Sequence, residues 1–366
     1  MKVIFRTDAS VLIGTGHVMR CLTLADELTR QGHQCSFICR EHPGHLADLI
    51  ASKGHGLTLL PPPSDPPLQQ ESSITKDYTR WLGVPWQEDA RQALDAITPL
   101  RPDWLVVDHY ALDTQWECAL ASAVDKIMVI DDLANRPHTC NLLLDQNLGR
   151  IESDYNKLLP TDCQRLIGPR YALLRPEFAA LREQSLERRK NPELKRILIS
   201  LGGVDRTNMT GQILATLADS SLPASTKLDI IMGATAPYLD EVRQQAQHLP
   251  FKATVSVNVK DMAERMRLAD LSIGAAGSTS WERCCMGLPS VTVILAENQR
   301  AIAVALAKYN AGLLVGIPQV TEELSGLIEM YAGDIEVRLL LSKNAAQVCD
   351  GGGAGRVVSA FTGEVV

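Results

Sequence analysis

The stretch KVIFRTDASVLIGTGHVMRCLTLADELTRQG, residues 2–32, decides the fold of the N-terminal half. Its apolar run of Val3, Ile4 and Phe5 predicts a buried β-strand. Apolar residues then recur at steps of three and four, which predicts an amphipathic helix ending at Gly32: Val18, Cys21, Leu22, Ala25 and Leu28. A strand, a glycine-containing turn and a helix in this order indicate the start of a parallel α/β sheet.

His17 lies at or beside the expected start of this helix, within GTGHVMR at residues 14–20. Free backbone N–H groups at a helix N-terminus attract an anion, and the helix dipole there disfavours a positive charge on the imidazole. The stretch therefore predicts a neutral base beside a phosphate or oxyanion site. A tight turn that only packs stays open as an alternative, because a lone Gly-x-Gly is weak evidence for nucleotide binding.

Composition limits the classes of function. A chain of 366 residues is long enough for two domains, and 36 Lys and Arg against 43 Asp and Glu argue against a general nucleic-acid or membrane-surface binder. No apolar run is long enough to span a bilayer, so we do not expect membrane insertion. We expect a cytoplasmic location. The nine cysteines form no Cys-x-x-Cys spacing, which favours reduced and mostly buried thiols.

Short β-branched runs alternate with helical stretches in both halves, which is typical of parallel sheets built from βαβ units. We expect an N-terminal domain at 1–185, a second domain at 192–350 and a tail at 351–366, with a charged, solvated helix and linker at 182–194. The glycines of GGGAG at 351–355 are expected to break any helix. Twelve strands are expected, at 2–6, 34–38, 56–60, 104–107, 127–130, 142–144, 196–201, 227–232, 254–257, 271–273, 290–293 and 313–315.

A second informative segment is LSIGAAGSTSWERCCMGLP, residues 271–289. Small residues follow a buried strand and lead into a helix, which predicts a backbone-lined site for a diphosphate, with hydroxyl groups added, at Gly277, Ser278, Thr279 and Ser280. Glu282, one turn into the helix, would repel phosphate but could hold the two hydroxyls of a ribose. A capping motif with an acid in the first turn is the alternative. SLGGVDRTN at 200–208 adds Gly202 and Gly203 as nucleotide-binding candidates.

Residues 259–289 resemble the nucleotide-binding segment of the GT-B glycosyltransferases. The resemblance implies an α/β fold with two Rossmann-type parallel-sheet domains that face each other across a cleft. It also implies that Glu282 holds the ribose, that Val259 and Met262 lie at the nucleotide base, and that Asn298 and Gln299 lie on the sugar side.

The N-terminal half resembles a narrower family. RTDAS at 6–10, GTGHVMR at 14–20, DHY at 108–110, DD at 131–132, YALLRPEF at 171–178 and SLGGVD at 200–205 are similar to the UDP-sugar hydrolases of pseudaminic acid biosynthesis. This resemblance implies release of UDP from UDP-2,4-diacetamido-2,4,6-trideoxy-β-L-altropyranose. The N-terminal turn with Gly14 and Gly16 then faces the sugar, and Tyr110 is a candidate sugar contact.

The chemistry of such a hydrolase fits these residues. UDP leaves as a stabilised anion, so the enzyme needs a base to activate water and donors to hold the diphosphate. His17 is the expected general base, with inversion at the anomeric carbon, and Asp8 either orients His17 or the water or caps the next loop. No cofactor and no metal are expected, and the UDP-sugar is the only expected binding partner. The chain is expected to be a monomer or a weak dimer. A GT-B glycosyltransferase, a non-hydrolysing epimerase and a non-catalytic nucleotide-sugar-binding module stay open.

Overall fold

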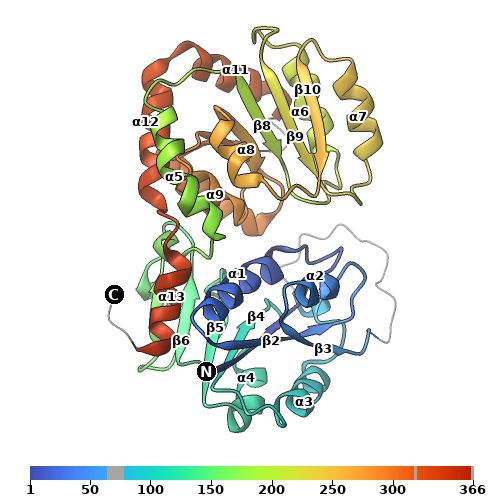
Figure 1. Ribbon diagram of the computed structural model, residues 1–366, viewed down its shortest axis with the longest axis vertical. Helices are drawn as coiled ribbons and strands as arrows, with labels where there is room; N and C mark the ends of the chain where they lie inside the picture. The colour runs from blue at the N-terminus through green and yellow to red at the C-terminus, as the bar shows by residue number, and fades with distance from the viewer. Residues whose placement is uncertain (64–77, 317–319, 364–366) are drawn as a thin grey trace. The chain divides into compact units, whose positions relative to one another are not determined.

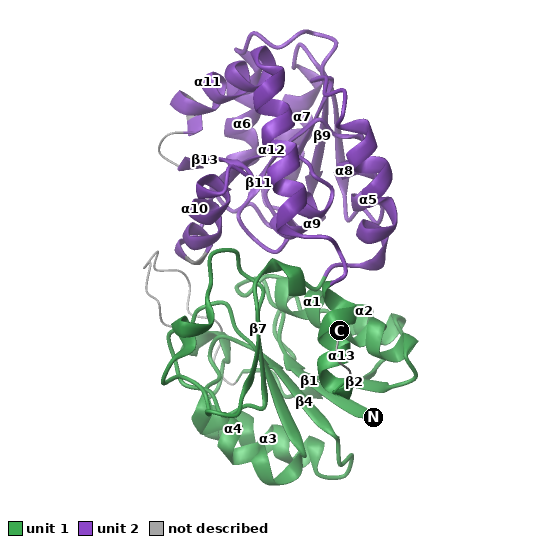
Figure 2. Cartoon of the chain, turned by 90° about the vertical axis from the view of Figure 1, so that its left-hand side faces the viewer, with its two compact units in different colours: residues 1–173, 353–366 green, residues 174–352 purple. Residues whose placement is uncertain are grey.

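The computed structural model describes residues 1–63, 78–316 and 320–363, without the side chains of Asn298 and Thr321. The chain forms two compact units (Figure 2). Unit 1 comprises Met1–Leu173 together with Gly353–Val366, and unit 2 comprises Leu174–Gly352. The change of unit at Leu173 therefore falls before the expected linker at 182–194. The loop at 64–77 lies outside the described residues.

Unit 1 contains a parallel sheet of seven strands in the order β3-β2-β1-β4-β5-β6-β7. The six strands that were expected are present with bounds that agree within two residues, and β7 was missed. The strands are β1 (Lys2–Thr7), β2 (Gln34–Arg40), β3 (Gly56–Leu60), β4 (Trp104–Asp108), β5 (Lys126–Ile130), β6 (Leu142–Asp145) and β7 (Gln164–Ile167).

Helices cover both faces of this sheet (Figure 1). Since side chains alternate along a strand, Val3 and Phe5 of β1 face one core and Ile4 faces the other. The first core is closed by α1 (Gly16–Arg30) and α13 (Gly353–Thr362), and the second by α3 (Trp86–Ile97) and α4 (Thr114–Leu120). Helix α2 (Ala47–Ser52) packs beside β3.

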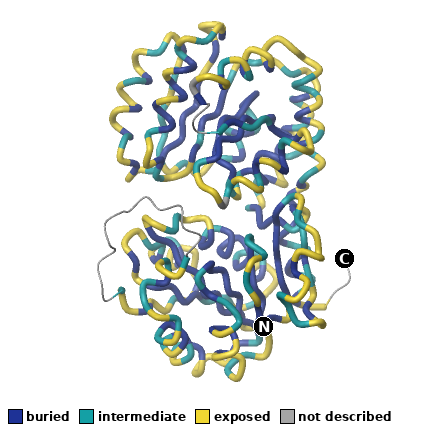
Figure 3. Tube along the Cα trace, turned by 180° about the vertical axis from the view of Figure 1, so that it is seen from behind, coloured by how far each residue is buried: buried dark blue, intermediate teal, exposed yellow. Residues whose placement is uncertain are grey.

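Unit 2 contains a parallel sheet of six strands in the order β10-β9-β8-β11-β12-β13. All six were expected. They are β8 (Arg196–Ser200), β9 (Lys227–Met232), β10 (Lys252–Val257), β11 (Leu271–Ala275), β12 (Ser290–Ile294) and β13 (Leu313–Gly316). The helices are α5 (Pro176–Arg188), α6 (Met209–Ala218), α7 (Leu239–Gln247), α8 (Met262–Leu268), α9 (Thr279–Cys285), α10 (Arg300–Lys308), α11 (Val320–Gly333) and α12 (Ile335–Val348). In both units the central strands are among the most deeply buried parts of the chain (Figure 3).

Two features at the ends of unit 2 differ in part from what was expected. The charged stretch is not only solvated, because Arg182 of α5 donates to the carbonyl oxygens of Ala346 and Cys349, and Arg189 is buried. Helical structure is interrupted between Val348 and Gly353, as expected for the glycine run, but α13 already begins at Gly353 within that run. A Cβ on Gly353 would lie 2.2 Å from the carbonyl oxygen of Ala172, so glycine permits this close approach.

Candidate active site

The carboxyl end of the unit 1 sheet collects acidic side chains. Because the strands are parallel, their carboxyl ends meet at one edge, where ligands bind in open α/β sheets. Four neighbouring strands each end at or immediately before an aspartate: Asp8 follows β1, Asp108 ends β4, Asp131 follows β5 and Asp145 ends β6. All four are buried. This edge is therefore the candidate site of unit 1.

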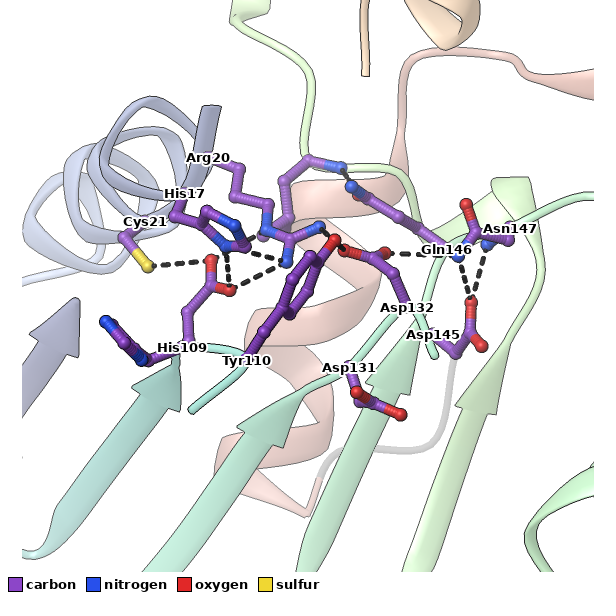
Figure 4. A network of polar contacts seen from close by, with 12 residues as sticks. His17, Arg20, Cys21, His109, Tyr110, Asp131, Asp132, Asp145, Gln146 and Asn147 are labelled. Carbon is purple, nitrogen blue, oxygen red and sulfur yellow. Dashed lines mark hydrogen bonds and ion pairs between the residues drawn. The ribbon is translucent and has the colours of Figure 1, made fainter. Parts of the chain in front are cut away.

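His17, in the first turn of α1, is paired with Asp108. Its Nδ1 lies 2.6 Å from Asp108 Oδ1, and its side chain is 10% exposed. Figure 4 shows His17 within the network of polar contacts at this edge. Since an ionised carboxylate only accepts hydrogen bonds, Nδ1 carries a proton, and in a neutral imidazole the lone pair is then on Nε2. Among the described residues, none hydrogen-bonds to Nε2. The arrangement presents a basic nitrogen.

Arg20, one turn further along α1, joins two of the carboxylates. Its Nε and Nη2 donate to Asp108 at 2.6 and 2.7 Å, and its Nη1 lies 2.8 Å from Asp132 Oδ2. Burial alone would raise the pKa of Asp108, but the charge of Arg20 and the hydrogen bonds from Arg20 and His17 outweigh it and hold that pKa below its ordinary value. Asp108 therefore stays ionised as the partner of His17.

Tyr110 links this pair to an aromatic cluster. Its hydroxyl donates to Asp132 Oδ2 at 2.7 Å, and its ring stands edge-on to the imidazole of His17 with centroids 4.6 Å apart. Trp81, from the 3₁₀ helix η1 (Thr79–Trp81), stacks on Tyr110 at 5.3 Å. Tyr110 is buried, and its hydroxyl proton is already donated to Asp132. A sugar in contact with this hydroxyl would have to compete with Asp132 for that proton or donate to the hydroxyl oxygen.

The structure assigns the partner of His17 to Asp108 rather than to Asp8. Asp8 is fully buried, pairs with Arg6 at 2.7 Å and accepts from the backbone N–H of Arg40. Its other oxygen lies 3.4 Å from His109 Nε2 and has no hydrogen-bond partner among the described residues. The expectation that Asp8 orients His17 is replaced by Asp108, which ends a strand 91 residues later in the chain.

The glycines of the N-terminal turn are accessible. Gly14 has a φ of +83°, a conformation that favours glycine, and its N–H donates to the carbonyl of Ser10 at 2.8 Å. A Cβ on Gly14 or Gly16 would meet no atom within 4 Å. Space for a ligand is therefore open beside both residues as far as the described side chains of unit 1 are concerned.

Asp132 and Asp145 were not among the expected site residues. Asn147 Nδ2 donates to Asp132 Oδ1 at 3.1 Å and to Asp145 Oδ1 at 2.8 Å, and Arg150 Nε donates to Asp145 at 2.7 Å. Burial and the charge of Asp132 raise the pKa of Asp145 to about 7, against the opposing charge of Arg150. The repeated aspartate at strand ends is the signal in the sequence that could have found them.

In unit 2, the loop between β11 and α9 is open at its tip. Gly277 has no atom within 4 Å of an added Cβ, Ser278 is exposed and Thr279 is half-buried. Ser280 differs from what was expected, because it is fully buried, its N–H donates to the carbonyl of Gly277 and its hydroxyl accepts from Arg283. Its hydroxyl is thus not exposed to a ligand in this structure.

Glu282 lies on the same short helix. Burial raises the pKa of its carboxyl to about 7, and the charge of Arg175, 3.7 Å away, offsets part of that effect. Its side chain keeps 16% of its surface exposed. Glu282 is therefore a partly accessible carboxyl whose protonation changes near neutral pH.

The other nucleotide candidates are also in unit 2. Gly202 and Gly203 are exposed with open space around them, but Asp205 already caps the N–H groups of Met209 and Thr210 at the start of α6. Val259 and Met262 are half-buried near the start of α8. Gln299 accepts from the N–H of Leu295, so its side chain closes a loop, and the side chain of Asn298 is outside the described residues.

No group of three or more metal-ligating side chains is found in the described parts of the chain. In those same parts, no helix combines the length and apolar character needed to cross a bilayer.

Comparison with known proteins agrees with this architecture. Residues 207–338 match the Glycosyltransferase family 28 C-terminal domain. The structure of MurG from Acinetobacter baumannii is similar to the whole chain, with a TM-score of 0.70, 16% identity and 99% of each chain covered. The chain has the GT-B fold. The two parallel-sheet domains expected from the sequence are thereby confirmed.

Two curated relatives extend the comparison. The chain is 28% identical over 310 residues to UDP-2,4-diacetamido-2,4,6-trideoxy-beta-L-altropyranose hydrolase of Campylobacter jejuni, covering 84% of this chain and 97% of the relative. It is 26% identical over 308 residues to an uncharacterised protein of Methanocaldococcus jannaschii, covering 82% of this chain. The match spans only 57% of the length of that second relative. The resemblance to the hydrolase noted in the motifs thus extends along most of the GT-B chain.

Proposed function

We propose that this chain hydrolyses a UDP-diacetamido-trideoxy sugar at its anomeric carbon, releasing UDP and the free sugar for nonulosonic (pseudaminic) acid biosynthesis. The observation that carries the proposal is the His17–Asp108 pair at 2.6 Å, which holds one imidazole nitrogen as a donor and leaves the other as a base. The similarity to the Campylobacter jejuni hydrolase supports the choice of substrate.

In the proposed step, the Nε2 lone pair of His17 takes a proton from a water molecule. The water oxygen bonds to the anomeric carbon as the bond from that carbon to the diphosphate oxygen breaks. UDP keeps the electron pair of that bond, so no second group must protonate the leaving oxygen. Attack from the side opposite UDP gives inversion.

Asp108 supports this step as a positioning residue. It fixes the tautomer and the orientation of the ring, and its charge stabilises the imidazolium that forms. Arg20, which is itself paired with Asp132, holds Asp108 in turn. Tyr110 and Trp81 pack against the imidazole and restrict its rotation.

The nucleotide is assigned to unit 2 in this proposal. The exposed Ser278 and the half-buried Gly277 and Thr279 offer amide and hydroxyl donors to a diphosphate, and Glu282 offers acceptors to a ribose. Gly202, Gly203, Val259 and Met262 line neighbouring loops of the same unit as further candidates. Gly14 and Gly16 stay the candidates for the sugar in unit 1.

A glycosyltransferase is the second candidate, because the fold and the family 28 domain are shared with transferases. An assay of UDP release without any acceptor separates the two. Using a small panel of UDP-diacetamido sugars, we expect steady turnover with the altro-configured substrate and a product of inverted anomeric configuration in the first NMR spectra. UDP release that requires an added acceptor would favour the transferase, and a retained anomer would contradict the direct attack of water.

A further inference from the structure

Arg283 is a buried cation at the base of the β11–α9 loop. Its exposed fraction is 2%, and Nη2 donates to the carbonyl of Ala275 and to the hydroxyl of Ser280, both at 2.9 Å. Its Nη1 occupies the position that a side chain on Gly274 would need, since a Cβ built there would lie 2.1 Å away. The strand thus has a glycine where the guanidinium lies. Arg283 is therefore built into the loop rather than placed on its surface.

The charge of Arg283 has no carboxylate partner among the described residues. Arg6, Arg20 and Arg40 of unit 1 are also buried, and each forms an ion pair with aspartate. The adjacent Glu282 instead faces Arg175. Burial lowers the pKa of Arg283 to about 10, so it is still a cation at neutral pH. A buried charge without a counter-ion is costly, and an anionic ligand would relieve that cost.

Arg189 shows what a purely structural buried arginine looks like in the same unit. It too lacks a carboxylate partner among the described side chains, but its guanidinium donates to the carbonyls of Ser185, Met266, Ala269 and Gly287. Every nitrogen of Arg189 is used. In contrast, Nε of Arg283 is buried and has no partner within the described chain. The two residues differ in this unmet donor.

The contacts of Arg283 lie on both sides of the loop tip. Ala275 precedes the tip and Ser280 follows it, while Gly277 and Ser278 between them are open to solvent. We propose that Arg283 is the buried counter-charge of a diphosphate bound at this tip, acting by its charge from beneath the loop, where Ser280 holds its guanidinium, rather than by direct contact. This inference rests on the proposed function, because it concerns the residues of unit 2 to which that proposal assigns the nucleotide.

A charge effect has a recognisable dependence on the ligand. Attraction between Arg283 and the ligand grows with the number of negative charges on the ligand. It therefore strengthens the binding of UDP most, that of UMP less and that of uridine not at all. A residue that only supports the fold would change all three affinities together. The ratio of the uridine to the UDP dissociation constant therefore reports the proposed role.

The test measures these three ligands by calorimetry on the full chain. We expect Arg283→Met to lower the affinity for UDP at least tenfold and the affinity for UMP by less, while the affinity for uridine changes by no more than twofold. Arg283→Lys should recover most of the UDP affinity. Arg189→Met is the matched control: it should lower the melting temperature and leave the ratio unchanged. Ser280→Ala should shift the ratio in the same direction as Arg283→Met, and it carries the test if Arg283→Met does not fold.

If the wild type binds UDP and Arg283→Met leaves the ratio unchanged, this inference is overturned and the proposed function stands. The same holds for an unchanged ratio in Ser280→Ala if Arg283→Met does not fold. If the wild type binds no UDP, both the inference and the nucleotide half of the proposed function are overturned.

Discussion

Asp108 Oδ1 lies 2.6 Å from Nδ1 of His17, and the same carboxylate receives two N–H groups of Arg20. One buried aspartate thus orients a base and neutralises a cation. Burial would favour its protonated form, but these two neighbours keep its pKa below the ordinary value. The imidazole is therefore held against a carboxylate that does not titrate in the range where a histidine acts.

Asp108→Asn should lower kcat by roughly 10²-fold or more, because the amide no longer fixes the tautomer of His17. UDP affinity should stay within about twofold, since Asp108 belongs to unit 1. Asp26→Asn is a matched control, because Asp26 Oδ1 lies 2.9 Å from His55 Nε2 and so also pairs with a histidine. This pair does not belong to the carboxyl edge of the sheet. A kcat for Asp108→Asn within threefold of the wild type would remove Asp108 from the mechanism.

Glu282 should make nucleotide binding depend on pH. Its pKa is raised to about 7, so the carboxyl is mostly protonated at pH 6 and mostly ionised at pH 8. The ionised form accepts from both ribose hydroxyls, and UDP affinity is therefore expected to rise several-fold across this interval. Glu282→Gln should flatten the profile measured by calorimetry. An equally steep rise in the glutamine variant would assign the titration to another group.

Asp89 should be a major contributor to the stability of unit 1. It is fully buried and accepts from Arg6, Arg40 and the indole N–H of Trp116. Removing one member of a buried ionic cluster leaves its partners unpaired, so Asp89→Asn is expected to lower the free energy of unfolding by about 3–5 kcal/mol.

Denaturant titration measures this loss. Asp95→Asn on the same helix is the control, because Asp95 pairs with Arg91 at an exposed position and its loss should cost about 0.5 kcal/mol or less. A similar small loss in both variants would show that the buried cluster does not stabilise the unit.

The fold was predictable because its signals are local. The step of three and four along α1 and the apolar runs of the strands carry the periodicity of a βαβ chain. The missed strand, β7, is short and has a charged residue at its second position, in QRLI. The return of α13 to unit 1 was not predictable, because the fit of Val357, Val358 and Phe361 depends on the core formed by residues 1–173.

The site was only partly predictable for a related reason. His17 is visible from its place before a helix, but its partner Asp108 lies 91 residues away and is brought near by the adjacency of β1 and β4. Asp8, which follows the first strand, was considered for this role, with capping of the next loop as the alternative, and Asp108 was noted only as part of the DHY motif. Arg283 went unnoticed because a basic residue inside a helix is usually exposed, and only the structure places it against Gly274.

The central claim is that His17 activates water, and the most direct test compares UDP release by the wild type and by His17→Leu without an acceptor. The proposal predicts a loss of at least about 10³-fold in turnover, with the dissociation constant for UDP nearly unchanged. Near-normal turnover by His17→Leu would contradict it.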